Sequence, residues 1–168
     1  MDLYILRHGI AVELGTEGIT EDSARALTAE GEAKTRQIAA ALKAMKLSFE
    51  LILSSPFLRA KQTADIVAAK LKATGALKLT DALAVGGSPR TLVRSIANRK
   101  PVPQSVLLVG HEPYLSELIS LLVAGPTGLD MTLKKGGLAK LAVPRLKYGR
   151  CATLEWLLTP KQLALMAG

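Results

Sequence analysis

The stretch "LYILRHG" at residues 3–9 decides how the rest of this chain is interpreted. Its apolar part, Leu3 to Leu6, has the length of one buried β-strand. The run stops at Arg7-His8-Gly9, so an arginine and a histidine stand at the carboxyl end of the expected strand. The chain contains only 2 histidines. The position of the second therefore decides whether the first is structural or functional.

Two later apolar runs end in the same way. The run Leu51 to Leu53 is followed by Ser54-Ser55-Pro56 and an expected helix whose first turn contains Arg59. The run Val106 to Val109 is followed by Gly110-His111-Glu112. Ligands of open α/β sheets bind beyond the carboxyl ends of the strands. A single histidine is more often structural, but two at strand ends favour a functional site. The sequence therefore predicts that both histidines and two arginines meet at one edge of a sheet.

Amphipathic helices are expected between these strands. They should run from Ala29 to about Met45, from Pro56 to about Ala73, from Pro89 to about Asn98, from Tyr114 to Val123, and briefly after Pro160. Further extended segments are expected at Leu77 to Val85, Leu138 to Val143 and Thr153 to Leu158. Strands that alternate with helices indicate an α/β fold, a three-layer sandwich whose mostly parallel central sheet has helices on both faces. We expect residues 1–168 to form one domain.

The composition is that of a globular protein, because 49% of the 168 residues are apolar. No apolar stretch approaches the roughly 20 residues that span a bilayer. The N-terminus lacks the basic and apolar regions of a signal peptide. Cys151 is the only cysteine, so no internal disulfide can form. These features predict a cytoplasmic protein that does not act at a membrane.

The formal net charge of +8 is compatible with an anionic partner. The basic residues are scattered, and aromatic residues make up only 4% of the chain. Single-stranded nucleic acids are usually bound by a basic groove with aromatic stacking platforms. The pattern therefore favours a surface with a mild preference for anions, and no nucleic acid partner is expected.

Two arginines and two histidines at one site point to a phosphate ligand. Guanidinium groups repel one another unless an anion lies between them, and their planar forks match phosphate oxygens. Free N–H groups at a helix start near Pro56 would add to anion binding. An imidazole there can attack phosphorus if one ring nitrogen is free and a hydrogen bond holds the other. Gly9 would allow the backbone a close approach.

Other chemistries lack the residues they need. A metal bound by His8 and His111 requires further ligands, and no H-x-x-x-H pair, cysteine pair or acidic cluster is spaced to supply them. Ser55 has no G-x-S-x-G context, which argues against a serine hydrolase. Cys151 lies in a basic stretch with no histidine nearby and is interpreted as an inert small residue. No metal site is therefore predicted.

These residues together resemble the histidine phosphatase superfamily, which includes the cofactor-dependent phosphoglycerate mutases. The motifs of the resemblance are "LRHG" at 6–9, "SSPFLRAKQTA" at 54–64 and "VGHEP" at 109–113. The small SixA-type phosphohistidine phosphatases are the most similar group, through "RHGIA", "LTAEG" at 27–31 and "GHEPYLS" at 110–116. The resemblance extends over nearly the whole chain. It implies a phosphoglycerate mutase-like fold.

The resemblance also implies a role for each matched residue. His8 would accept the phosphoryl group and form a phosphohistidine intermediate, which water would then hydrolyse. Arg7, Arg59 and His111 would hold the phosphate oxygens, with Gly9 beside them. The resemblance implies no metal and no organic cofactor.

The proton donor for the leaving group is not obvious in this sequence. Many members of the superfamily carry a carboxylic acid in an inserted segment that this short chain lacks. Glu112 is the first candidate because it follows His111, but it can also cap the helix that follows. Glu13 and Glu21, in the loop after the expected nucleophile, are alternatives. A site without any proton donor is the remaining alternative. General acids typically contribute about 10²–10⁴-fold, so a weak acid site favours phosphohistidine, whose imidazole leaves readily.

The expected function is therefore a phosphatase that removes phosphate from a phosphohistidine of a signalling protein, such as a histidine-phosphotransfer domain. The short chain should leave the mouth of the site uncovered, which would admit a protein. A phosphatase for small phosphate monoesters and a non-catalytic phosphate-binding module are the alternatives. The sequence leaves the oligomeric state open.

Overall fold

A computed structural model of the chain describes residues 1–167, apart from the side chain of Glu17. Its centre is a six-stranded sheet with the order β3-β2-β4-β1-β5-β6. The strands are β1 (Asp2–Arg7), β2 (Leu51–Ser54), β3 (Leu77–Leu79), β4 (Ser105–Gly110), β5 (Leu138–Ala142) and β6 (Thr153–Leu158). The first four strands pair in parallel, whereas β5 is antiparallel to both β1 and β6. The prediction of a mostly parallel sheet is confirmed.

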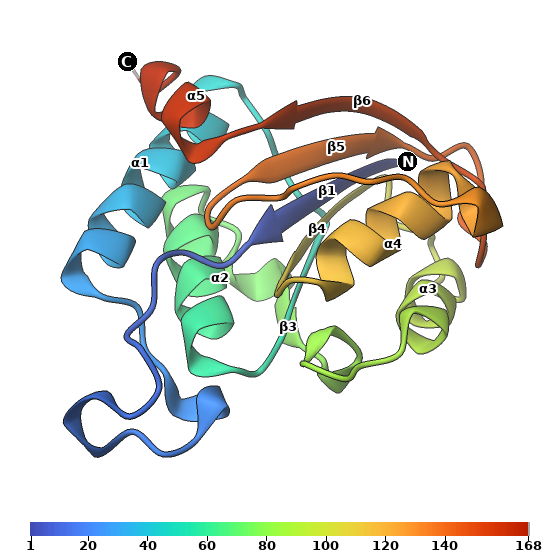
Figure 1. Cartoon of the computed structure of the whole chain (residues 1–168). Coiled ribbons are helices and arrows are strands. Elements are labelled where there is room, and N and C mark those ends of the chain that lie inside the picture. Colours follow the sequence, from blue (N-terminus) through green and yellow to red (C-terminus); the bar gives the residue numbers. More distant parts are fainter. Residues whose placement is uncertain (168) are drawn as a thin grey trace.

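Helices cover both faces of this sheet (Figure 1). They are α1 (Ala29–Ala44), α2 (Leu58–Lys70), α3 (Pro89–Ala97), α4 (Tyr114–Val123) and α5 (Pro160–Leu165). Helices α1, α2 and α5 share one core with Tyr4 and Leu6 of β1. Helices α3 and α4 share the other core with Leu3 and Ile5. Because side chains alternate between the faces of a strand, the single run Leu3 to Leu6 contributes to both cores, which makes the fold three-layered.

Hydrogen bonds from side chains cap the starts of α1 and α3, where the sequence predicts these helices to begin. Thr28 accepts a hydrogen bond from the backbone N–H of Gly31, and Ser88 accepts one from the N–H of Thr91. Each cap satisfies one of the free N–H groups of the first helical turn. The expected boundaries of α1, α3 and α4 are thereby confirmed to within a residue or two.

The predicted start of α2 at Pro56 is wrong by two residues, because the helix begins at Leu58. Ser55 explains the difference: its hydroxyl accepts the N–H of Phe57 at 3.2 Å, which holds the chain in a turn before the helix. Arg59 still lies in the first helical turn, as expected.

The predicted extended segment Leu77 to Val85 is also shorter than expected. Strand β3 ends at Leu79, and Asp81–Leu83 forms a 3₁₀ turn. The Thr80 hydroxyl accepts the N–H of Ala82 at 3.3 Å and so caps this turn. A capped turn of this kind competes locally with strand formation.

Between β1 and α1 the chain leaves the sheet as a loop of residues 12–26, here called the 12–26 segment (Figure 1, lower left). It contains two 3₁₀ turns, Thr16–Gly18 and Asp22–Ala24. Its base is closed by an antiparallel bridge between Ala11 and Leu27. Across the described residues 1–167, no helix has both the length and the apolar character needed to cross a membrane.

Candidate active site

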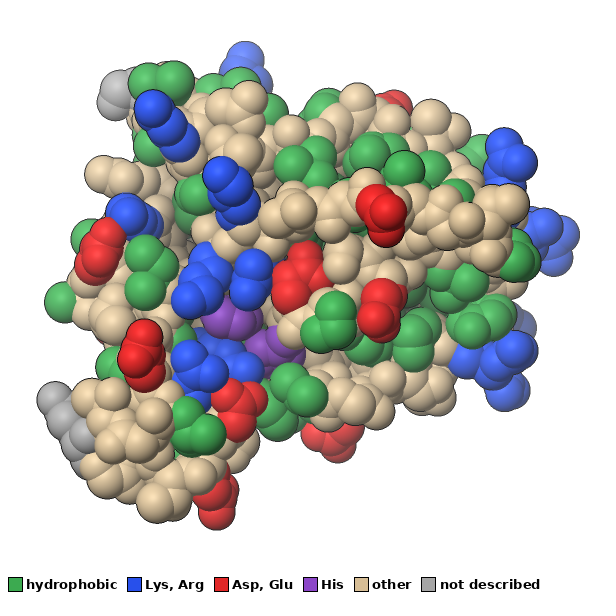
Figure 2. All heavy atoms as spheres, viewed as in Figure 1, with side chains coloured by type: hydrophobic (Ala, Val, Ile, Leu, Met, Phe, Trp, Pro, Cys, Tyr) green, Lys and Arg blue, Asp and Glu red, His purple; other side chains and the backbone are tan. Residues whose placement is uncertain are grey.

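The two histidines meet at the carboxyl ends of neighbouring parallel strands. His8 follows β1 and His111 follows β4, and the register of the two strands pairs Arg7 with Gly110. The two rings have centroids 5.1 Å apart, and the residues are only 5% and 2% exposed. Figure 2 shows them side by side in a hollow with Lys and Arg side chains around it. The predicted meeting of the histidines at one sheet edge is confirmed.

The two ring nitrogens of His8 have different partners, a backbone carbonyl oxygen and the Arg59 side chain. Nδ1 lies 2.7 Å from the carbonyl oxygen of Gly9 and must donate its hydrogen there, because a carbonyl only accepts. Nε2 therefore carries the lone pair and accepts the Nε–H of Arg59 at 3.2 Å. Burial lowers the pKa of His8 to about 3, so the imidazole is neutral at neutral pH. A neutral ring with an available Nε2 has the form that a nucleophilic histidine requires.

His111 is oriented by a hydroxyl that the motif contains. Ser55 Oγ accepts the N–H of Phe57 at 3.2 Å and lies 2.7 Å from His111 Nε2. The Ser55 hydroxyl can either donate to Nε2 or accept from it, and in the tautomer where it donates, the hydrogen of His111 lies on Nδ1. Burial, followed by the charge of Arg59, lowers the pKa of His111 to about 4. Nδ1 is buried and has no hydrogen-bond partner among the described residues, so in that tautomer it is a donor free to bind an anion.

Arg7 provides a second free donor. Its NH1 group donates to the carbonyl oxygen of Leu133 at 2.9 Å. Its Nε is buried and has no partner among the described residues. Buried donors are rarely left unpaired, so an orphaned one needs a ligand or water to complete it. Burial lowers the pKa of Arg7, and the Glu112 carboxylate opposes that effect.

Arg59 is held by Asp22, a residue that sequence reasoning missed. Arg59 is 4% exposed, and its two terminal nitrogens donate to the backbone carbonyl oxygen of Asp22 at 2.6 Å and to Oδ2 of the same residue at 2.9 Å. The other carboxylate oxygen of Asp22 accepts from Arg25 at 2.8 Å. Burial raises the pKa of Asp22, but the hydrogen bonds from Arg25 and Arg59 outweigh it and leave the pKa below its ordinary value.

Gly9 is required by close packing beside His8. A Cβ atom there would lie 2.6 Å from the Thr35 hydroxyl oxygen and 3.3 Å from the carbonyl oxygen of Gly31. The N–H of Gly9 donates to the Thr63 hydroxyl at 3.1 Å, and that hydroxyl donates to the carbonyl oxygen of Arg59 at 2.7 Å. These contacts join the segment after β1 to helix α2, so they fix His8 relative to Arg59.

The three candidate proton donors have different surroundings. Glu112 caps α4, because its Oε2 accepts the hydroxyl of Ser116 at 2.6 Å and the N–H of the same residue at 3.2 Å. Glu21 is exposed in the 12–26 segment and accepts from Ser23 at 3.3 Å, and Glu13 is exposed in the same segment. The roles of all three as donors stay predictions. Within residues 1–167, no group of three or more His, Cys, Asp or Glu side chains could hold a metal ion.

Comparison with known proteins agrees with these features. A model of the histidine phosphatase superfamily (branch 1) matches residues 3–84. Phosphohistidine phosphatase SixA of Escherichia coli is 29% identical over 168 residues, with 98% of each chain covered. The chain belongs to the histidine phosphatase superfamily. The chain is also 39% identical to an uncharacterized protein of Picosynechococcus over 142 residues, 84% of each chain.

Solved structures of two other proteins share the fold of this chain. The structure of the protein histidine phosphatase SixA complexed with tungstate has a TM-score of 0.80 at 28% identity, covering 97% of this chain and 99% of that one. A phosphoglycerate mutase from Bacillus anthracis shares the fold at 14% identity, with a TM-score of 0.67 and coverage of 100% and 97%. The predicted phosphoglycerate mutase-like fold is confirmed. The family and these SixA relatives support a phosphatase, and so a hydrolase.

Proposed function

We propose that this protein is a phosphohistidine phosphatase that works through a covalent phosphohistidine at His8. The observation that carries the proposal is the available Nε2 of His8, whose ring lies 5.1 Å from that of His111. Two buried nitrogens, Arg7 Nε and His111 Nδ1, have no partner among the described residues and belong to the same strand ends. We propose that both donate to a phosphoryl group that faces the nucleophile. The SixA structure that resembles this chain is a complex with tungstate, also a tetrahedral oxyanion.

The reaction has two steps. In the first, the Nε2 lone pair of His8 forms a bond to phosphorus, the bond from phosphorus to the substrate nitrogen breaks, and the leaving imidazole takes up a proton. In the second, water attacks the phosphorus, the bond to Nε2 breaks and inorganic phosphate leaves. Arg7, Arg59 and His111 stabilise the charge on the phosphoryl oxygens in both transition states. Arg59 must turn its Nε–H from Nε2 toward a phosphate oxygen when substrate binds.

The surroundings of Glu112 favour a nitrogen leaving group over an oxygen leaving group. Its Oε2 is engaged by Ser116 at the start of α4, so this oxygen serves as a helix cap instead of as a general acid. An alkoxide needs a proton from such an acid, and its help is typically worth about 10²–10⁴-fold. An imidazole leaves as a neutral molecule once its nitrogen is protonated. We therefore propose a phosphohistidine of a signalling protein, such as a histidine-phosphotransfer domain, as the substrate.

The proposal is tested with a histidine peptide that has been phosphorylated with phosphoramidate, compared with p-nitrophenyl phosphate. We expect the wild-type protein to hydrolyse the peptide with the higher kcat/KM. His8→Ala should reduce hydrolysis about a thousandfold or more, because the covalent step is lost. A rapid quench with ³²P-labelled peptide should trap label on wild-type protein that is stable in alkali and lost in acid.

A matched control replaces Arg36, an exposed residue of α1 paired with Glu32. Arg36→Ala should keep the activity of the wild type, whereas Arg59→Ala should lose most of it. Faster turnover of the ester than of the peptide would assign the protein to small phosphate monoesters. Anion binding without any turnover would make it a phosphate-binding module. Either result would contradict the proposed function.

A further inference from the structure

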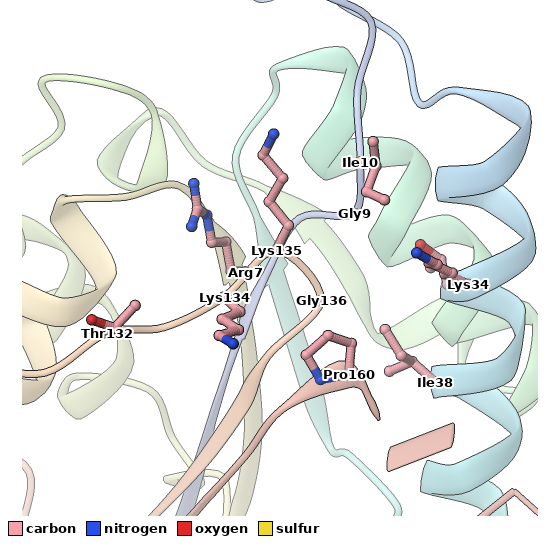
Figure 3. Close-up of a pocket in the computed structure, with 11 residues that line it drawn as sticks. Arg7, Gly9, Ile10, Lys34, Ile38, Thr132, Lys134, Lys135, Gly136 and Pro160 are labelled. Atoms are coloured by element: carbon pink, nitrogen blue, oxygen red, sulfur yellow. The ribbon is translucent and has the colours of Figure 1, made fainter. Parts of the chain in front are cut away.

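A pocket of about 440 Å³ opens beside Arg7, on the side of β1 that faces α1. We call it the lysine pocket and define it by six residues that line it: Lys34, Lys134, Lys135, Ile10, Ile38 and Pro160. Figure 3 shows the side chains of Arg7 and Lys135 extending to one side of the pocket, with Ile38 and Pro160 at the other. The pocket thus combines a basic rim with an apolar wall, and its rim begins at a residue of the proposed phosphate site.

The rim carries positive charge that the protein itself does not neutralise. Lys134 and Lys135 are exposed, and neither has a carboxylate of the described residues within 4.0 Å. Lys34 differs, because Glu30 pairs with it at 2.6 Å on the surface of α1. Figure 3 shows the two side chains extending in opposite directions from the turn, so each ammonium group is a separate positive charge that an anion could neutralise. The rim is therefore suited to a carboxylate-bearing partner.

The lysines are held at a fixed place relative to the nucleophile. The N–H of Gly136 lies 3.1 Å from the carbonyl oxygens of both Arg7 and His8. Gly136 has a φ of +74°, and a Cβ atom there would lie 2.7 Å from Cδ1 of Ile38. The turn therefore needs glycine both for its backbone conformation and for its contact with α1. As a result, the backbone of Lys134 and Lys135 is attached directly to the segment that carries His8.

We propose that the lysine pocket docks an acidic segment of the protein substrate that lies next to its phosphohistidine. This inference rests on the proposed function, because it assumes that the substrate is a phosphorylated protein. Carboxylates of the segment would approach Lys134 and Lys135, and an apolar side chain of the segment would contact Ile38 and Pro160. Such complementarity raises the association rate and fixes the register of a docked chain. The pocket would thus select phosphoproteins by the residues that flank the phosphohistidine.

Two matched phosphohistidine peptides test the inference. One carries Glu and Ile beside the phosphohistidine, and the other carries Gln in place of every Glu. We expect the full-length protein to hydrolyse the acidic peptide with a kcat/KM about threefold to tenfold higher, mainly through a lower KM. The advantage should shrink as salt is raised, because both lysines are exposed. In Lys134→Glu/Lys135→Glu, the ratio of the two kcat/KM values should fall to about one or below.

The matched control reverses the same charge elsewhere. Arg145 and Lys147 are exposed in the loop between β5 and β6, at the opposite end of β5 from the lysine pocket. In Arg145→Glu/Lys147→Glu, the net charge changes by the same amount, and the preference for the acidic peptide should remain. If this control loses the preference as fully as the pocket variant does, the effect comes from overall charge and the docking inference is wrong.

The outcomes separate this inference from the proposed function. Equal rates for the two peptides, each dependent on His8, would overturn the docking site and leave the phosphatase intact. No His8-dependent hydrolysis of either peptide would overturn the proposed function itself. Inhibition by inorganic pyrophosphate that weakens in Lys134→Glu/Lys135→Glu, with no difference between the peptides, would assign the pocket to a second phosphate of a small molecule. That result would also overturn docking of an acidic segment.

Discussion

Asp22 sets the orientation of Arg59, which in turn contacts the ring nitrogen of His8 that we propose as the nucleophile. The carboxylate bridges two arginines, with one oxygen toward Arg25 and the other toward Arg59. Asp22, in the polar 12–26 segment, thereby holds the side chain of Arg59 in the first turn of α2. Because the Arg59 side chain is 4% exposed, the loss of its carboxylate partner would leave a buried charge less well compensated.

We predict that Asp22→Asn lowers kcat/KM for phosphohistidine peptide about tenfold, in the range that removal of a supporting partner causes. The free energy of unfolding should fall as well, because the buried Arg59 guanidinium loses its carboxylate partner. Enzyme assays and urea unfolding of the same preparations measure the two effects. Asp65→Asn is the matched control, because it breaks an exposed ion pair with Lys61 on the same helix as Arg59. Equal activity in the two variants would contradict the positioning role of Asp22.

The residues of the site differ in how far the sequence predicts them. His8 and His111 were predictable because each follows an apolar run, and parallel strands bring their carboxyl ends to one edge. Asp22 was not predictable, since it lies 37 residues from Arg59 in a polar loop that contains other acidic residues and has no periodic pattern. The contact between the Ser55 hydroxyl and His111 Nε2 joins residues 56 apart in the sequence, and only the three-dimensional structure shows it.

At the scale of elements, α1 and the chain after β1 depend on contact between two backbones. A Cβ atom at Gly31, in the first turn of α1, would lie 1.9 Å from the carbonyl oxygen of Ile10. The N–H of Thr28 donates to that same carbonyl oxygen at 3.0 Å, and the Thr28 hydroxyl accepts the N–H of Gly31 at 2.9 Å. The start of the helix therefore supports the segment that carries His8.

We predict that Gly31→Ala lowers the free energy of unfolding by about 1–3 kcal/mol, because backbone atoms must move apart to admit the methyl group. Activity should fall as well, since Ile10 adjoins Gly9 and His8. Gly75→Ala is the matched control: nothing lies within 4 Å of a Cβ atom there, and its φ is not in the left-handed region. Chemical unfolding and peptide hydrolysis measure both variants. A stable, fully active Gly31→Ala would show that α1 can shift away from β1 without cost.

The elements also differ in predictability for physical reasons. Helix α4 was predicted at its observed bounds because a turn precedes it and its apolar residues repeat at helical spacing. Strand β3 was predicted too long, because the Thr80 cap that ends the extended segment leaves no periodic signal. The antiparallel direction of β5 was not predicted, because strand direction depends on the long connection from α4 rather than on residue types.

At the scale of the whole molecule, the site makes stability depend on pH. Burial lowers the pKa of His8 to about 3 and that of His111 to about 4. The same side chains titrate near about 6.5 in an unfolded chain. Below that pH the unfolded chain binds protons that the folded protein does not, so acid favours unfolding. The stability that the neutral histidines contribute is complete above pH 6.5 and is lost progressively as the pH falls toward about 4.

We predict that acidification from pH 7 to pH 5 costs about 1–2 kcal/mol of unfolding free energy for each histidine, at about 1.4 kcal/mol per unit of pKa difference. Urea unfolding at the two pH values measures the change. In His8→Gln/His111→Gln, neither side chain titrates, so most of this pH dependence should disappear. A double variant that loses as much stability on acidification as the wild type would mean that other groups cause the loss.

The 12–26 segment begins and ends at nearly the same point, since the bridge from Ala11 to Leu27 and a 2.9 Å hydrogen bond from Val12 to Ala26 close its base. A loop with a closed base can be exchanged for a longer one at little conformational cost, about 0.6 kcal/mol for each doubling of length. A longer loop could therefore replace the 12–26 segment and cover the proposed phosphate site. If the longer loop retained Asp22, Arg59 would stay in place. The covered site would then exclude the proposed protein substrates and admit only small metabolites.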